Sequence, residues 1–217
     1  MLLSGESRRF GSETSNNVFV QLVDGHDMAR MDGEIEAVCH MCESTDWHVV
    51  AVPVSDWFQD LTPWAADPVF GNQRFGDGAS RTLGALLETL KPGPRYCLCG
   101  YSLAGLFALW AGCQTDAFSG IVAASPSVWY PDWIAYSEAH PIQVPAVYLS
   151  LGDREERARN PVMASVGSAI RRQHEILRAA GIRTALEWNP GNHFVNSDAR
   201  MARGIAWMLN ATDGGNG

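Results

Sequence analysis

The sequence lacks several features, and each absence argues against one class of protein. No run approaches the roughly 20 apolar residues of a membrane span, and residues 1–6 have no apolar core of signal-peptide length. Basic residues are outnumbered, 16 against 24 acidic ones, which leaves a net charge of −8. Nucleic acid and anionic membranes are therefore poor partners, and we expect a soluble cytoplasmic protein.

Cysteine is scarce as well, with five residues in a chain of 217, which is long enough to bury a core without disulfides. Cys39 and Cys42 have the CxxC spacing of a metal or redox site, but no second pair of ligands accompanies them. Both fall on one helical face with Val38, so we interpret them as buried helix cysteines. Cys97 and Cys99 are interpreted as buried strand residues, and no metal site is expected.

Apolar runs of strand length alternate with helical patterns along the chain. Strands are predicted around 8–10 and at 18–23, 49–54, 96–99, 120–124, 146–151 and 184–188. Helices are predicted at 32–43, 79–90, 102–113, 161–180 and 199–209. One more helix, after the segment at 125–133, is predicted to end near residue 139. The continuously apolar strands predict a mostly parallel sheet with helices on both faces. We expect a single domain over 1–217, with a disordered tail from about residue 211.

A long connection at 55–78 is rich in aromatic residues, which argues for an ordered, packed loop. Several aromatic residues are expected at one edge of the sheet: Trp57, Trp64, Phe75, Trp129 and Trp133. They could wall an apolar substrate pocket or close the core under the loop, and both interpretations stay open. The pocket candidates are Trp57, Trp64 and Trp129.

The pattern at 100–104, Gly-x-Ser-x-Ala, joins a predicted strand to an Ala- and Leu-rich helix. A serine at the tip of a strand–turn–helix is typical of a nucleophile elbow, because the sharp turn lifts the hydroxyl clear of the sheet. Gly100 and Ala104 are small enough for the strand and helix to approach closely. The second small residue is Ala where the usual motif has Gly. The context predicts Ser102 as a nucleophile.

A serine nucleophile needs a base and an orienting acid. His193 follows the last predicted strand and is the candidate base. Asp153, Glu155 and Glu156 follow the strand at 146–151, and the residues alone do not choose among them. The chain order of nucleophile, acid and histidine is that of α/β-hydrolases.

Oxyanion donors are expected from the main chain. One is the N–H of Leu103, directly after the nucleophile. The other is expected in the loop after the strand at 18–23, from Gly25 or His26.

Five segments together resemble a known family: VQLVDG at 20–25, GYSLAGL at 100–106, SPSVW at 125–129, LSLGDREE at 149–156 and GNHF at 191–194. The set is similar to the esterase family that forms the esterase D and enterochelin esterase-like branch of the α/β-hydrolases, which includes feruloyl esterases and mycolyltransferases. The resemblance runs from about residue 18 to 209. It implies an α/β-hydrolase fold, a Ser–acid–His site with Glu155 as the acid, and no metal or organic cofactor. The sequence departs from the family in lacking any large cap, so we expect a minimal one.

The expected function is hydrolysis of a carboxylic ester or thioester of modest size through an acyl-enzyme. The expected partner is a small-molecule ester. Transfer of the acyl group to an alcohol by the same residues is an alternative, and so is a non-catalytic binding protein on a hydrolase scaffold. A homo-oligomer stays open, because an exposed aromatic edge could serve a dimer.

Overall fold

A seven-stranded sheet forms the centre of the molecule in the computed structural model, which describes residues 6–213, with side chains to residue 210. The strand order is β1-β3-β2-β4-β5-β6-β7. Only β1 runs antiparallel to its neighbour β3, and the other pairs are parallel. The strands are β1 (Arg8–Gly11), β2 (Asn17–Val23), β3 (His48–Pro53), β4 (Arg95–Tyr101), β5 (Gly120–Ala124), β6 (Ala146–Gly152) and β7 (Arg183–Asn189).

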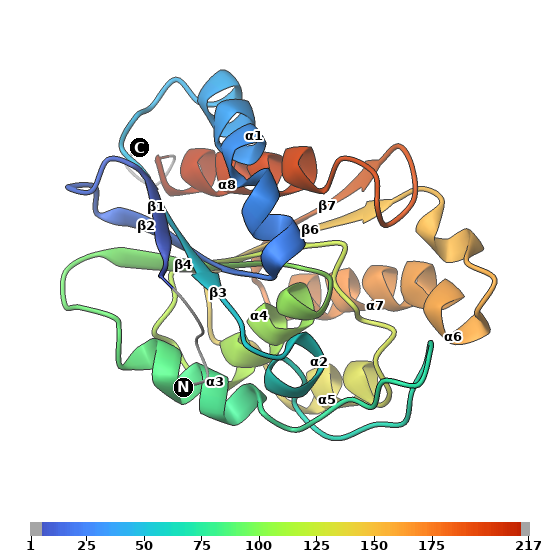
Figure 1. Ribbon diagram of the computed structural model, residues 1–217. Helices are drawn as coiled ribbons and strands as arrows, with labels where there is room; N and C mark the ends of the chain where they lie inside the picture. The colour runs from blue at the N-terminus through green and yellow to red at the C-terminus, as the bar shows by residue number, and fades with distance from the viewer. Residues whose placement is uncertain (1–5, 214–217) are drawn as a thin grey trace.

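Helices cover both faces of this sheet, as Figure 1 shows. One face carries α1 (Gly25–Met41) and α8 (Ser197–Asp213). The other carries α3 (Ala79–Leu87), α4 (Ser102–Gln114), α5 (Trp133–Ala139) and α7 (Val166–Ala179). Successive strand residues point to opposite faces, so in β2 Val20 joins the α4 side of the core and Phe19 the α8 side. The predicted parallel sheet with helices on both faces is confirmed.

Three predicted helix boundaries differ most from the structure. Helix α1 begins at Gly25 and not at residue 32, because Asp24 caps it by accepting a hydrogen bond from the Asp27 N–H. The predicted helix at 161–180 is two helices, α6 (Pro161–Ala164) and α7, with the break at Ser165. Helix α8 continues to Asp213, so residues 211–213 of the expected tail are helical, and its remainder lies outside the described residues.

The aromatic connection at 55–78 is ordered, as predicted. It contains the short helix α2 (Trp57–Asp60) and a bridge between Ala66 and Phe75. Phe75 is buried and packs against Phe58, Phe70 and Trp129. The contact with Trp129, which follows β5, packs the loop beside the carboxyl ends of the strands.

The cysteine prediction is only half right. Cys97 and Cys99 are buried in β4, but Cys39 is exposed and Cys42 half-buried. Helix α1 packs through residues such as Met31 and Val38, which turns Cys39 toward solvent. Within residues 6–213 no three His, Cys, Asp or Glu side chains are placed to hold a metal ion. None of the helices in that range has both the length and the apolar character for a membrane crossing.

Candidate active site

The carboxyl ends of the parallel strands bring the predicted site residues to one edge of the sheet. Register places Leu22 of β2 beside Gly100 of β4, and Tyr101 of β4 beside Ala124 of β5. Strand β6 ends beside β7, where Gly152 pairs with Asn189. The segments that follow these strands therefore meet, as expected for an open α/β sheet.

Ser102 stands at a strained turn between β4 and α4. Its φ is +57°, in the left-handed region that a serine rarely adopts. A Cβ at Gly100 would overlap the carbonyl group of Ala104, so only glycine allows the strand and helix to approach this closely. The Ser102 side chain stays partly exposed. The local geometry is that of the predicted elbow.

His193 links Ser102 to Glu155. Its Nε2 lies 3.1 Å from Ser102 Oγ, and its Nδ1 lies 2.7 Å from Glu155 Oε2. With Nδ1–H donating to the carboxylate, Nε2 is left to accept the serine proton. The His193 side chain is 25% exposed and that of Glu155 only 5%.

The Glu155 carboxylate is held by several donors. Its Oε1 accepts from the Gly152 N–H, from the Ser125 hydroxyl and from Arg200 Nη1, each at 2.7 Å. Burial pushes the pKa of Glu155 upward, but hydrogen bonds from His193, Ser125 and Gly152 outweigh it and leave the pKa below its ordinary value. The carboxylate is therefore ionised at neutral pH.

The other two acidic candidates point elsewhere. Asp153 Oδ1 accepts from the Gly191 N–H at 2.9 Å, which fastens the turn after β7. Glu156 pairs with Arg171 of α7 at 2.9 Å. Of the three carboxylates left open by the residue pattern, Glu155 is the one brought to His193.

The expected oxyanion donors lie at two helix N-termini. Leu103 is the second residue of α4, so its N–H has no partner within the helix. Gly25 and His26 begin α1, and do not form the loop that was predicted for them. Their N–H groups are likewise free of intrahelical partners. Because β2 and β4 are neighbours, both positive helix ends face the same edge.

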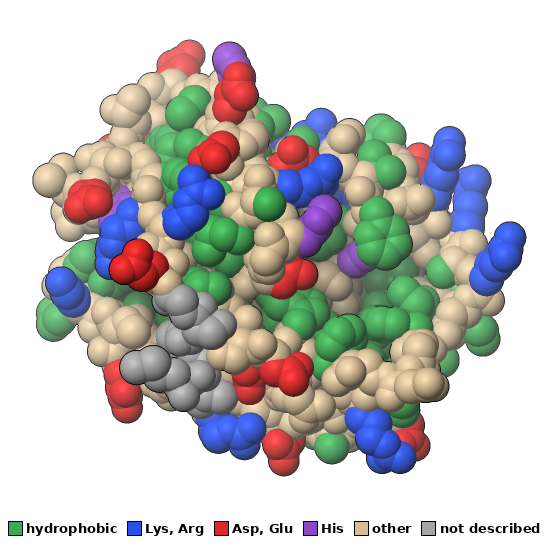
Figure 2. Space-filling view, in the orientation of Figure 1, with side chains coloured by type: hydrophobic (Ala, Val, Ile, Leu, Met, Phe, Trp, Pro, Cys, Tyr) green, Lys and Arg blue, Asp and Glu red, His purple; other side chains and the backbone are tan. Residues whose placement is uncertain are grey.

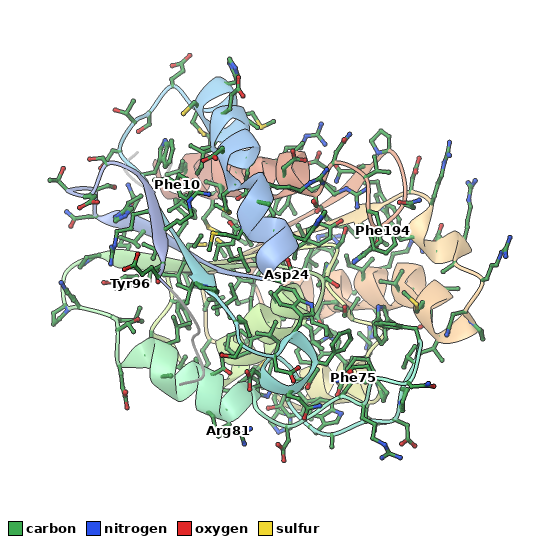
Figure 3. The ribbon with its side chains drawn as sticks, in the orientation of Figure 1. Phe10, Asp24, Phe75, Arg81, Tyr96 and Phe194 are labelled. Carbon is green, nitrogen blue, oxygen red and sulfur yellow. The ribbon has the colours of Figure 1, made fainter. Side chains whose placement is uncertain are left out.

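An apolar hollow lies beside these residues. Figure 2 shows hydrophobic side chains gathered in it, with histidines at its border. Figure 3 labels Phe194 on one side of this region and Phe75 on the other. Phe194 is 81% exposed and meets the His193 ring edge-on, with the ring centroids 5.3 Å apart. Phe70 is also exposed.

The three predicted pocket tryptophans have different surroundings. Trp57 is half-buried at the start of α2, and Trp129 is half-buried against Phe70. Trp64 donates its indole N–H to the Pro131 carbonyl at 3.1 Å and packs against Tyr130. Those contacts assign Trp64 to loop packing and leave Trp57 and Trp129 as candidates for the pocket.

The residue pattern did not identify some side chains at the site. Arg200 of α8 contacts Glu155, and the Tyr101 hydroxyl donates to the His193 carbonyl at 2.6 Å. The available signal for Arg200 is its spacing of four from Gly204 and eight from Met208, which places it on the buried stripe of α8. Ser127 Oγ lies 3.4 Å from Ser102 Oγ, and its N–H donates to the Ser102 carbonyl.

Asp27 is a second carboxylate near the histidine. Burial and the charge of Asp24 raise the pKa of Asp27 to about 6, while electrostatic interactions with His26, His193 and Arg30 act in the lowering direction. No pattern in the sequence marked this residue.

Comparisons with known proteins give no match to any family model and none to a curated protein. Solved structures do match. The siderophore hydrolase EstA from Aspergillus nidulans is 22% identical with a TM-score of 0.65, over 93% of this chain and 86% of that one. An IroE-like serine hydrolase from Shewanella oneidensis is 16% identical with a TM-score of 0.69, over 94% and 80%.

A third similar structure is the enterobactin esterase FES from Shigella flexneri, crystallised in the presence of 2,3-dihydroxy-N-benzoyl-serine. It is 16% identical with a TM-score of 0.66, over 95% of this chain and 56% of that one. The α/β-hydrolase fold predicted from the sequence is confirmed.

Proposed function

We propose that this protein is a serine hydrolase that cleaves carboxylic esters or thioesters of modest size through an acyl-enzyme. The observation that carries the proposal is the contact of His193 with Ser102 at 3.1 Å and with Glu155 at 2.7 Å. The named hydrolases and esterases among the similar structures support it at the level of the fold.

The reaction follows from this geometry. His193 Nε2 takes the proton of Ser102 as Oγ attacks the acyl carbon, and the Glu155 carboxylate stabilises the imidazolium that forms. The bond to the leaving oxygen or sulfur breaks as His193 returns the proton to it. A water molecule then repeats the sequence on the acyl-enzyme and releases the acid and free serine.

The negative oxygen of each tetrahedral intermediate needs donors, each worth roughly 2.7–4 kcal/mol. We propose the Leu103 N–H as one, with Gly25 or His26 supplying the other. The positive N-terminal ends of α1 and α4, where these residues lie, support this assignment.

The apolar hollow in Figure 2 supports a small ester with an apolar part as the substrate. We propose Trp57 and Trp129 as residues of its wall. This reaction calls for no cofactor. The net charge of −8 supports a small molecule, and neither nucleic acid nor a membrane surface, as the partner of a cytoplasmic enzyme. The alternative of a non-catalytic binding protein loses support, because His193 lies within hydrogen-bond reach of Ser102.

The test is turnover of nitrophenyl esters from acetyl to decanoyl by the wild-type protein and the Ser102→Ala variant. The variant should lose up to about 10⁶-fold in kcat if the three residues act as a unit. Ser119→Ala is the matched control, since Ser119 donates to the Tyr96 carbonyl at the far end of the strands. Esterase activity retained by Ser102→Ala would contradict the assignment. Acceptor alcohols added to the same assay would reveal acyl transfer as a new ester product.

A further inference from the structure

Arg200, in the first turn of α8, is fully buried. A buried arginine is rare unless its charge is paired and its donors are satisfied. Its Nη1 lies 2.7 Å from Glu155 Oε1, 2.8 Å from Ser125 Oγ and 3.1 Å from Tyr101 Oη. Its Nη2 donates to the Asn192 carbonyl at 2.8 Å. Within the described residues Nε has no partner, so all its hydrogen bonds are made by the terminal nitrogens.

The partners of Arg200 share one property: each adjoins or belongs to the proposed catalytic set. Tyr101 directly precedes the nucleophile, and Asn192 directly precedes His193. The Ser125 hydroxyl at the end of β5 donates to Glu155 Oε1. One guanidinium therefore joins the segments at the carboxyl ends of β4, β5, β6 and β7.

We propose that Arg200 is the positioning residue of this site, holding Glu155 Oε1 so that Oε2 faces His193 Nδ1. The proposal rests on the proposed function, because it assigns Arg200 a part in the same reaction. Arg200 is a positioning residue and not a catalytic one, since it is fully buried and acts on the histidine through the carboxylate.

The geometry requires arginine in particular. A planar guanidinium offers donors in a fixed fork, so one side chain can bind a carboxylate, a hydroxyl and a carbonyl at the same time. A lysine at position 200 would present a single ammonium group and could not keep both the Glu155 and the Asn192 contacts. An apolar side chain there would leave Glu155 buried without its ion pair.

Arg200→Met should lower kcat about 100-fold with little change in KM, because misplacement of a catalytic group harms the chemical step. The kcat of Arg200→Lys should lie between those of Arg200→Met and the wild-type protein. Arg203→Met is the matched control: Arg203 lies on the same helix, is about half exposed and pairs with Glu187, away from His193. It should keep wild-type kcat.

The pH profile separates positioning from general damage to the fold. The charged groups that face His193 are Glu155, Arg200 behind it, and Asp27 from α1. Loss of the positive charge of Arg200 favours protonation of its neighbours, so the acid limb of kcat/KM should move to higher pH in Arg200→Met. Arg203→Met should leave that limb in place.

A double-mutant cycle with Glu155→Gln tests whether Arg200 acts through the carboxylate. Arg200→Met should cost much less in the Glu155→Gln background than in the wild type. Full additivity, or a folded Arg200→Met variant with wild-type kcat and pH profile, would overturn the proposal. If Arg200→Met does not fold, the same cycle is run with Arg200→Lys, and additivity there overturns it equally.

Failure of the proposed function is distinguishable from failure of this inference. Wild-type protein that hydrolyses no ester would contradict the proposed function, whatever the Arg200 variants do. Proton NMR of the His193 Nδ1–H then tests Arg200 without turnover. A resonance that broadens or moves in Arg200→Lys, but not in Arg203→Met, supports the positioning role, and identical resonances in all three proteins overturn it.

Discussion

Two buried glutamates, Glu155 and Glu34, illustrate how differently one protein treats the same side chain. Counted over the whole residue, backbone included, Glu155 is 7% exposed and Glu34 is 4% exposed. The pKa of Glu155 lies below its ordinary value, whereas that of Glu34 is raised to about 8. Burial raises the pKa of both carboxyls, so burial does not explain the difference. The number and charge of their hydrogen-bond donors explain it.

Glu34 has few partners. It faces β2 from α1, and its Oε2 accepts from the Gln21 side chain at 3.1 Å. Glu34 Oε1 and Gln21 Oε1 have no partner within the described residues. Both side chains line a cavity of about 10 Å³, room for about one water molecule. Burial first, and then the negative charges of Asp27 and Asp198, keep the Glu34 proton bound at neutral pH.

Replacement of each glutamate by glutamine should have very different effects on the reaction. Glu155→Gln should lower kcat by about 10⁴-fold, because an amide can impose the wrong tautomer on His193 and cannot stabilise the imidazolium. Glu34→Gln should leave kcat unchanged, since Glu34 is already neutral and does not contact the triad. Steady-state kinetics on one nitrophenyl ester measures both. Equal losses in the two variants would contradict the distinction.

The second effect is on the pH dependence of stability. Because folding raises the pKa of Glu34 from 4.5 to about 8, the native protein binds more protons than the unfolded chain across that window. Stability contributed by this group is therefore lost as pH rises through it, by up to about 1.4 kcal/mol per pH unit. Glu34→Gln should remove this loss, as measured by urea unfolding at pH 5 and pH 8.

Glu155 should show the opposite sign. Its pKa is lower in the folded protein, so its contribution is present above its ordinary value and is lost as pH falls through the folded value. For Glu34, the contradicting result is a free energy of unfolding that changes between pH 5 and pH 8 by the same amount in Glu34→Gln as in the wild type. That result would show that Glu34 is not the buried neutral acid.

The smallest effect concerns the Gln21–Glu34 pair. Gln21→Leu leaves the Glu34 carboxyl without its hydrogen bond and should cost about 1–3 kcal/mol in the free energy of unfolding. The double replacement Gln21→Leu/Glu34→Leu should recover most of that loss, because both polar partners are then gone. A double variant less stable than Gln21→Leu would show that this polar pair stabilises the fold.

Much of the site could be predicted because strand ends converge in a parallel sheet. Ser102 and His193 follow predicted strands, and the structure brings them within 3.1 Å. The choice among Asp153, Glu155 and Glu156 could not come from the residue pattern. Those residues lie in one irregular turn, and contacts from Gly191 and Arg171, distant in sequence, set their directions.

Other features depend on tertiary contacts that no local pattern reveals. Arg200 is a charged residue on the buried side of a helix, and its role depends on the four strand ends that meet it. The start of α1 was missed for a different reason. Gly25 and His26 are poor helix formers, and the capping carboxylate of Asp24 outweighs that preference.

The most direct test of an activated serine at the elbow is labelling with a fluorophosphonate probe, read by intact mass. The wild-type protein should gain a single adduct, and Ser102→Ala should gain none. Glu155→Gln should label more slowly than Glu34→Gln, as the comparison of the two glutamates requires. A folded wild-type protein that takes up no probe, or an adduct that persists in Ser102→Ala, would contradict the assignment of Ser102, His193 and Glu155 as a catalytic unit.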